Sequence, residues 1–162
     1  MKLFRKILIA SGLLVSSMSF AYASNQPIES SRDWNSFKSE NNNFCYNVTF
    51  SDDSDENYVT VAHFTSNNQY NIISLNFAED VSQAENITAS IDKTISFEMF
   101  RINNSVFLMN DQSNMVEHMK KGYKLEVSVK LSNGTYIKKS YSLLGFTKTY
   151  KAMSKECGVK PL

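Results

Sequence analysis

The stretch YKLEVSVKLSNGTYIKKSYSL, residues 123–143, decides the fold class of this chain. From Tyr123 to Leu131, apolar residues at odd positions alternate with polar ones, the period of two that is typical of a strand with one wet face. Ser132-Asn133-Gly134 then predicts a hairpin turn in which Asn-Gly supplies the positive φ angles. Residues 135–143 are the expected return strand. The stretch therefore predicts an antiparallel hairpin, with the odd-numbered residues of its first strand facing a core.

Working outward, short runs of β-branched and aromatic residues between turn-forming Asn, Asp, Ser and Gly predict more strands. These expected strands are Trp34–Lys38, Phe44–Phe50, Tyr58–Thr65, Tyr70–Phe77, Asn86–Ile91, Ile95–Phe100 and Ser105–Met109. Helical spacing occurs in 114–121, with Asp111 or Ser113 as cap and Gly122 as its end, and in 146–156. We therefore expect a mainly β fold, an antiparallel β sandwich or curled sheet with two short helices in the C-terminal third.

Length and charge narrow the class of protein. The chain has 162 residues, 42% of them hydrophobic, which suits one β-rich domain over residues 34–162 with a real core. A formal net charge of +1 with 20% charged residues argues against a basic nucleic-acid binder, so no nucleic-acid partner is expected. Two cysteines exclude a four-cysteine zinc site and a dense disulfide scaffold.

The first 23 residues have the three-part pattern of a secretory signal peptide. Lys2, Arg5 and Lys6 precede an uncharged apolar run, and Ala21-Tyr22-Ala23 offers an A-x-A cleavage site. A transmembrane anchor is the alternative, but the run of 14 residues with four serines is short and polar for a span of about 20. We expect cleavage near Ala23, a flexible lead-in over 24–33, no transmembrane span in the mature chain, and a periplasmic, secreted or outer-membrane associated protein.

The C-terminal third carries the most specific motifs of the chain. Met119-Lys120-Lys121-Gly122 ends the first expected helix, and Ser142-Leu143-Leu144-Gly145-Phe146-Thr147 leads into the second. Trp34, the Cys45-Tyr46 pair and Ile91-Asp92 complete the pattern on the N-terminal side. Together these motifs resemble the invasion-associated locus B family of exported alphaproteobacterial proteins, over nearly the whole expected mature chain.

The resemblance implies an exported, non-enzymatic envelope protein. Such a protein would be a binding or accessory factor in bacterial association with, or invasion of, host cells, with an unknown envelope or host-surface partner. The resemblance implies no reaction, no cofactor and no catalytic residue. The alternative is a hydrolase or other enzyme whose site is built from scattered Asp, Glu, His or Tyr residues. A concave pocket that joins His63 or His118 to a carboxylate would favour the enzyme, and an open β surface with exposed aromatic residues would favour the binding protein.

Cys45 and Cys157 are the candidate site residues. They could form a disulfide, one could be a catalytic nucleophile while the other has no catalytic role, or both could remain free thiols. An even pair in an exported protein favours the disulfide. A catalytic cysteine needs a base, and His63 and His118, the only histidines, lie in no signature of a cysteine enzyme. The sequence therefore predicts no catalytic residue, no metal ligand set and no cofactor.

Two charged stretches leave alternatives open. Asp52 to Glu56 is a dense acidic run, which we expect to form a solvated hairpin turn. A loose divalent-cation site is the alternative, although an EF-hand template fails because Tyr58 and Phe64 occupy its Gly and Glu positions. Lysines gather between Lys120 and Lys155. They are expected to lie on solvated faces and to protect sheet edges; a basic surface for acidic lipid or polysaccharide is the alternative.

Overall fold

A computed structural model describes residues 26–40, 43–103 and 105–162, so the expected signal peptide, 1–23, lies outside the described residues. The strands are β1 (Glu29–Ser31), β2 (Trp34–Lys38), β3 (Phe44–Phe50), β4 (Tyr58–Phe64), β5 (Gln69–Asn76), β6 (Ala84–Ile91), β7 (Ile95–Ile102), β8 (Ser105–Leu108), β9 (Lys124–Leu131) and β10 (Tyr136–Ser142). The helices are α1 (Gln112–Lys121) and α2 (Phe146–Glu156), with a 3-10 turn at Thr65–Asn67. The expected mainly β class is confirmed.

All the strands of the described part belong to one antiparallel sheet rather than to the two sheets of a sandwich. Its order is β1-β2-β3-β4-β5-β8-β7-β6-β9-β10. The sheet curls without closing, because β10 returns towards the end of β3 only at a bridge between Ser51 and Tyr141. There the Asp52 N–H donates to the Ser140 carbonyl oxygen at 2.9 Å. Of the two architectures that the sequence allows, the curled sheet is the one observed.

Part of the expected flexible lead-in, 24–33, is a strand. β1 pairs with β2 in antiparallel register, with Glu29 opposite Ser36 and Ser31 opposite Trp34. The segment lacks the apolar alternation that would predict a strand. Beside this pairing with the adjacent strand, Lys148 of α2, which is distant in sequence, forms an ion pair with Glu29 at 2.9 Å. The flexible-segment expectation is therefore wrong for residues 29–31.

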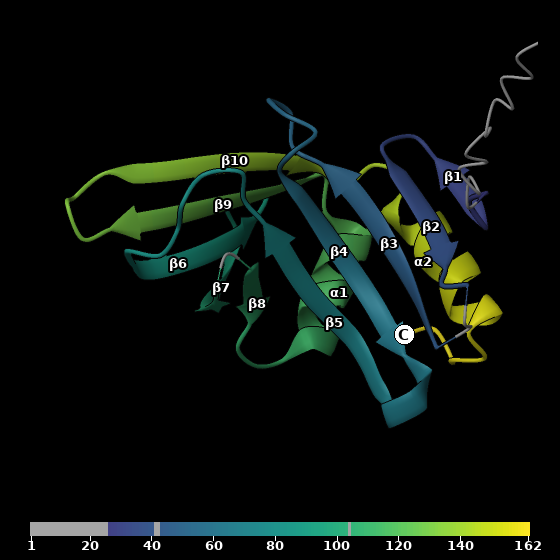
Figure 1. Cartoon of the computed structure of the whole chain (residues 1–162). Helices are drawn as coiled ribbons and strands as arrows, with labels where there is room; N and C mark the ends of the chain where they lie inside the picture. The colour runs from purple at the N-terminus through teal and green to yellow at the C-terminus, as the bar shows by residue number, and fades with distance from the viewer. Residues whose placement is uncertain (1–25, 41–42, 104) are drawn as a thin grey trace, which may run out of the picture.

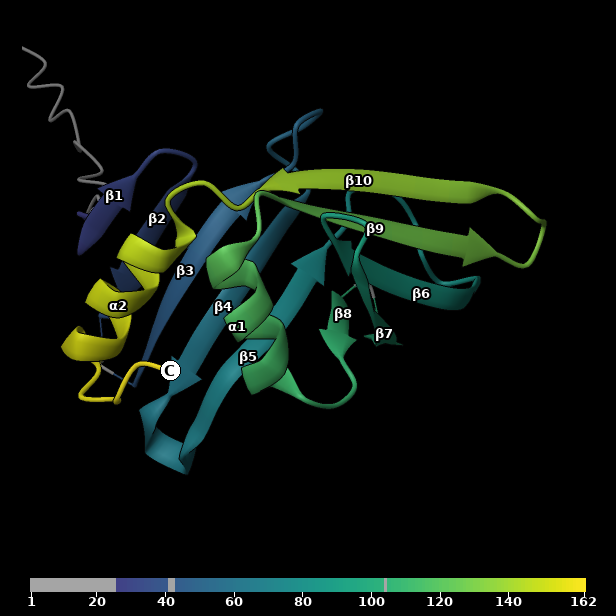
Figure 2. The same cartoon turned by 180° about the vertical axis from the view of Figure 1, so that it is seen from behind.

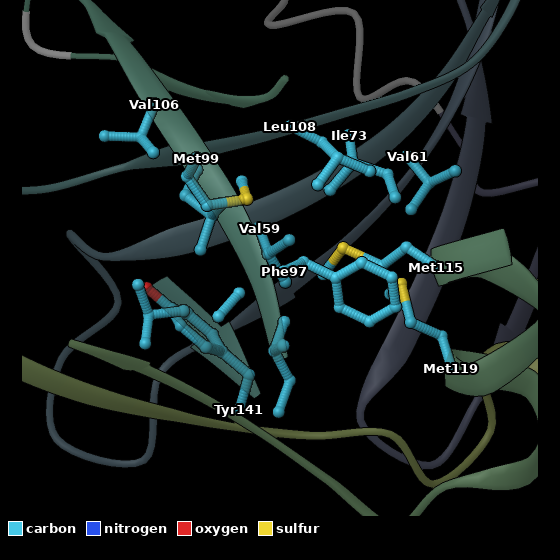
Figure 3. Packing of buried hydrophobic residues seen from close by; sticks show 14 of the residues in the cluster. Val59, Val61, Ile73, Phe97, Met99, Val106, Leu108, Met115, Met119 and Tyr141 are labelled. Atoms are coloured by element: carbon cyan, nitrogen blue, oxygen red, sulfur yellow. The ribbon is translucent and has the colours of Figure 1, made fainter. Parts of the chain in front are cut away.

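Both helices cover the inner face of the curled sheet (Figures 1 and 2). α2 packs on β1, β2 and β3, and α1 packs on β5. Met115 and Met119 of α1 point into the core beside Ile73, Phe97 and inner-face residues of β4, β7 and β8 (Figure 3). The helical spacing of the methionines thus reflects burial against the sheet.

Gly145 allows the last helix to approach the N-terminal strands. Its φ of +97° is a left-handed conformation, and a Cβ atom here would lie 1.9 Å from the Ser31 carbonyl oxygen. Trp34 secures the same corner, since its indole Nε1–H donates to the Ser142 carbonyl at 2.8 Å and its ring lies 4.7 Å from that of Phe146. Gly145 and Phe146 of the recognised motif are therefore structural residues.

The first helix begins earlier than expected and is capped differently. α1 starts at Gln112, and neither Asp111, which occupies the N-cap position, nor Ser113 caps it through its side chain. At its other end Gly122 has an extended backbone, and a Cβ atom there would lie 2.5 Å from the Ile91 side chain. Gly122 thus ends the helix as expected, but it is required for space rather than for a positive φ.

The hairpin of β9 and β10 is present with two corrections. Gly134 has a φ of +82°, whereas Asn133 has no positive φ, so the loop is a three-residue turn with one left-handed residue rather than an Asn-Gly pair of them. Leu125, Val127 and Val129 face the core as expected, but Tyr123 is 72% exposed. At this end of β9 the Asp92 carboxylate accepts hydrogen bonds from the Tyr123 and Lys124 backbone N–H groups at 3.1 and 2.9 Å.

Candidate functional site

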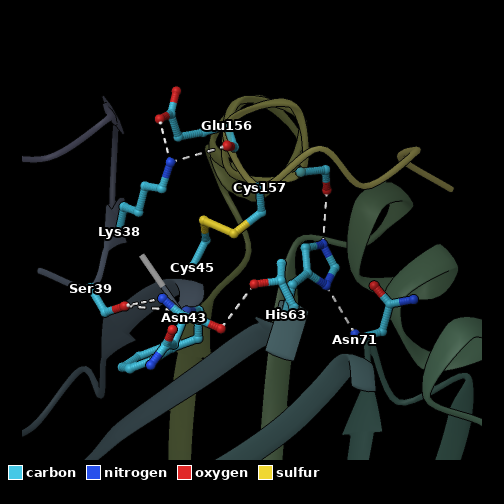
Figure 4. Close-up of a disulfide and its surroundings, with 11 residues drawn as sticks. Lys38, Ser39, Asn43, Cys45, His63, Asn71, Glu156 and Cys157 are labelled. Carbon is cyan, nitrogen blue, oxygen red and sulfur yellow. Dashed lines mark hydrogen bonds and ion pairs between the residues drawn. A yellow bond between two sulfur atoms is a disulfide. The ribbon is translucent and has the colours of Figure 1, made fainter. Parts of the chain in front are cut away.

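Cys45 and Cys157 form a disulfide in the structure (Figure 4). Their Cα atoms are 6.1 Å apart, although the residues are 112 positions apart in sequence. Cys45 is fully buried on the inner face of β3, and Cys157 directly follows α2. The bond fixes the end of that helix to the sheet, and the described part of the chain contains no free thiol.

His63 is a buried structural residue. The Asn71 backbone N–H donates to its Nδ1 at 3.1 Å, so Nδ1 is unprotonated and the neutral ring donates from Nε2 to Ser154 Oγ at 3.0 Å (Figure 4). Tyr70 and Tyr150 contact the ring edge-on. Burial lowers the pKa of His63 to about 4. Because Nε2 already carries its proton, His63 is not placed to accept one from Ser154.

His118 lies elsewhere, half-buried on α1 with its ring 6.1 Å from that of Phe97. Neither histidine lines any of the five best-formed hollows on the described residues. None of these five hollows therefore joins a histidine to a carboxylate, the arrangement that would favour an enzyme.

The acidic run, Asp52 to Glu56, connects β3 to β4, and the Asp53 carboxylate within it is already paired. Asp53 accepts hydrogen bonds from Ser51 Oγ at 2.5 Å and from Lys139 Nζ at 2.9 Å, and these bonds lower the pKa of Asp53. Asp52 lies 3.8 Å from Lys124. Among the residues that the structure describes, no three His, Cys, Asp or Glu residues gather around a possible metal position.

Lys139 is the unexpected member of the C-terminal lysines, because its side chain is only 6% exposed. Nζ lies 2.5 Å from Glu79 and 2.9 Å from Asp53. Burial alone disfavours the charged amine, but these two hydrogen bonds and charges outweigh it and raise the pKa of Lys139. The cluster ties β10 to the segments that follow β3 and β5, so Lys139 is part of the fold.

The other lysines do not form one basic surface. Lys120 and Lys121 pair with Glu117, Lys124 pairs with Asp52, and Lys148 pairs with Glu29 on the opposite part of the sheet. The exposed Lys151 and Lys155 lie on α2, whereas Lys138 lies on β10. The solvated-face interpretation therefore fits better than a continuous basic patch.

A groove lined mainly by polar side chains lies on the outer face of the sheet. Its volume is about 490 Å³, and it lies along β6, β9 and β10 under the turn of Asp52 and Asp53. Six residues form its floor; they are Thr88, Ser90, Glu126, Ser128, Lys138 and Ser140. We call this hollow the polar groove, and the six residues its floor.

The strand register explains why these six side chains meet. Ser90, Glu126 and Ser140 lie opposite one another in a first row across the three strands, and Thr88, Ser128 and Lys138 form the next row. Cross-strand partners share a face of the sheet, so all six side chains point to the same side. The sequence places Glu126, Ser128, Lys138 and Ser140 on the wet face of the hairpin. It could not show that Thr88 and Ser90 lie beside them, because β6 is distant in sequence.

The groove side chains are free to bind a ligand. Within the described ranges, none of the six side chains forms a hydrogen bond or an ion pair with another protein group. Lys138 Nζ lies 6.0 Å from the centroid of the Tyr136 ring. Glu126 offers a carboxylate between two serine hydroxyls, and Lys138 offers an ammonium group in the adjacent row. Lys93 adds a second amine at one end. The floor can both donate and accept hydrogen bonds, and it offers charges of both signs.

One curled antiparallel sheet, with two helices on its inner face and a polar groove on its outer face, defines a small helix-backed β protein. The same fold is found in invasion associated protein B from Bartonella henselae, whose crystal structure matches with a TM-score of 0.62. The match covers 78% of this chain and 95% of that chain at 12% sequence identity, and it establishes the fold alone. No family model and no curated protein matches the sequence.

Proposed function

We propose that this chain is an exported envelope protein that acts by binding rather than by catalysis, with the polar groove as its ligand surface. The observation that carries the proposal is the groove itself, in which six polar side chains lie together without partners. Polar side chains on a protein surface ordinarily pair with neighbours or solvent. A concave array of them on rigid strands is suited to hydrogen-bonding a polar partner at several points at once.

Export is supported by two features of different kinds. Residues 1–23 have the pattern of a signal peptide with processing near Ala23, and the disulfide between Cys45 and Cys157 suits an oxidising compartment. The structure's helices offer no membrane-spanning candidate within the described residues. We place the mature protein in the periplasm, or secreted or attached at the outer membrane.

The biological role that we propose is accessory: assistance in bacterial association with, or invasion of, host cells. It is supported by the motifs shared with the invasion-associated locus B family and by the likeness of fold to a protein named as invasion associated. The partner we propose is an envelope or host-surface molecule. An enzyme remains the competing class, but the burial of His63 and the position of His118 outside the groove give it no support.

The experiment compares two tryptophan variants of the mature protein, residues 24–162, in capture of partners from envelope and host-surface extracts. Ser128→Trp fills the groove floor, and we expect it to lose a partner that the wild-type protein retains. Ser66→Trp places the same side chain in the exposed turn between β4 and β5 and should retain that partner. Equal capture by Ser128→Trp and wild type would refute the groove as the binding surface.

A further inference from the structure

The outer face of β2, β3 and β4 carries aromatic side chains where a solvated sheet would carry polar ones. We call this surface the aromatic face; its residues are Phe37, Phe44, Tyr46, Phe50, Tyr58 and Phe64. The rings contact one another in pairs, with centroids 5.4 Å apart for Phe37 and Tyr46 and also for Phe44 and Phe64. The face continues across the sheet to Ile72 on β5 and Phe107 on β8.

Neither helix covers the aromatic face. Both helices lie on the opposite side of the sheet, as the front and back views show (Figures 1 and 2). The rings are half-buried by one another, and Phe50 is 41% exposed. Between the rings lie Val48, Thr60, Ala62 and Ser74, so this part of the face contains no charged side chain. Aromatic enrichment without charge is the composition of an interface core.

The size of the face matches what a stable dimer needs. Strands lie about 4.8 Å apart and rise about 3.4 Å per residue, so β2, β3, β4, β5 and β8, with 5, 7, 7, 8 and 4 residues, cover roughly 500 Å² in plan. Because large side chains project from the sheet, the accessible area of the face is greater than this plan area. It approaches the ~800 Å² that each partner contributes to a standard interface. A flat apolar sheet face can pack on its own copy as the two sheets of a sandwich do, about 10 Å apart.

Charge at the rim favours a second copy over a lipid surface. Asp55 and Glu56 lie exposed at one end of the face, directly before β4, whereas membrane-binding faces are usually rimmed by lysine and arginine. The opposite end holds the uncharged turn of residues 65–69 and, after β2, one lysine and one glutamate, Lys38 and Glu40, which balance in charge. A two-fold axis running across the strands places the acidic end of one copy over this end of the other, which has no net charge.

We infer that the protein is a homodimer in which the aromatic faces of two copies pack against each other. None of the floor residues of the polar groove belongs to the aromatic face. The dimer therefore presents two grooves, and the inference does not depend on what those grooves bind.

The test is the mass of the mature, disulfide-bonded protein in solution, measured by light scattering after size exclusion and by sedimentation at micromolar concentrations. We expect twice the mass of one chain. Tyr46→Glu places a charge between Phe37 and Phe44 and should give a monomer with an unchanged circular dichroism spectrum. Tyr123→Glu changes an isolated, 72% exposed tyrosine and should remain a dimer.

Phe50→Ser is the second variant, chosen because Phe50 is 41% exposed, so we expect its loss to leave the fold intact. It should weaken the dimer at least tenfold. A wild-type protein that is monomeric at all concentrations would overturn the inference, as would a Tyr46→Glu variant that stays dimeric. Binding of a monomeric wild type to phosphatidylglycerol vesicles, lost in Tyr46→Glu, would assign the face to a lipid surface instead.

Discussion

At the scale of single residues, buried polar groups join parts of the chain that are far apart in sequence. His63 on β4 connects to Ser154 of α2 and to the Asn71 amide, and Tyr150 donates to Asn71 Oδ1 at 2.8 Å. The sequence shows His63 only as a histidine on a strand beside apolar neighbours. Its partners lie 8 and 91 positions away, so no local pattern could have revealed them.

The burial of His63 predicts a pH dependence of stability. Its pKa is about 4 in the folded chain and about 6.5 when exposed, so the unfolded chain binds the proton first. The stabilisation that depends on keeping His63 neutral is fully present above about pH 6.5 and is lost as the pH falls from about 6.5 to about 4. The difference between the folded and unfolded pKa values of His63 corresponds to roughly 3 kcal/mol in the free energy of unfolding.

Urea unfolding at several pH values checks this prediction. Between pH 6.5 and 4 the free energy of unfolding should fall more steeply for the wild-type protein than for His63→Gln. His118→Gln, which changes the partly exposed histidine of α1, is the control variant. The same slope in His63→Gln and in the wild type would show that the protonation of His63 is not linked to unfolding.

At the scale of elements, the position of α2 depends on contacts at both of its ends. Gly145 brings its first turn against Ser31, and the disulfide holds its last turn to β3. Lys38 adds an ion pair with Glu156 at 3.0 Å beside the disulfide. The helix therefore links the start of the described chain to its end.

Removal of the disulfide should destabilise the protein strongly. The crosslink joins residues 112 positions apart, and for such a loop the chain-entropy model gives about 4–5 kcal/mol as an upper figure. We expect Cys45→Ser combined with Cys157→Ser to lose most of this free energy in urea unfolding, and residues 146–156 to exchange their amide hydrogens faster. A double variant as stable as the wild type would contradict the structural role of the bond.

The strands and helices could be predicted largely from local pattern, because the hydrophobic periodicity of each element is visible in consecutive residues. Phe44–Phe50 and residues 146–156 have the predicted bounds. Two of the misses involve partners that are distant in sequence. β1 has an ion pair with Lys148 of α2 beside its pairing with β2, and Lys139 is buried between Glu79 and Asp53. The polar groove is a miss of the same kind, since curling of the sheet brings the 52–53 turn over β10.

At the scale of the whole molecule, the outer face of one sheet changes its chemistry along the strand order. It is aromatic on β2 to β4 and polar on β6, β9 and β10. The inner face is filled by one core under two helices. The two outer regions offer separate surfaces, the first for a second copy of the chain and the second for a polar partner.

Lysine footprinting tests the proposed binding function most directly. The mature protein is acetylated with and without envelope extract, and each lysine is quantified by mass spectrometry. Lys138 and Lys93 line the polar groove, whereas Lys151 and Lys155 lie exposed on α2. The account predicts that a bound partner protects Lys138 and Lys93 and leaves Lys151 and Lys155 reactive. Protection of Lys151 and Lys155, with Lys138 and Lys93 still fully reactive, would contradict it.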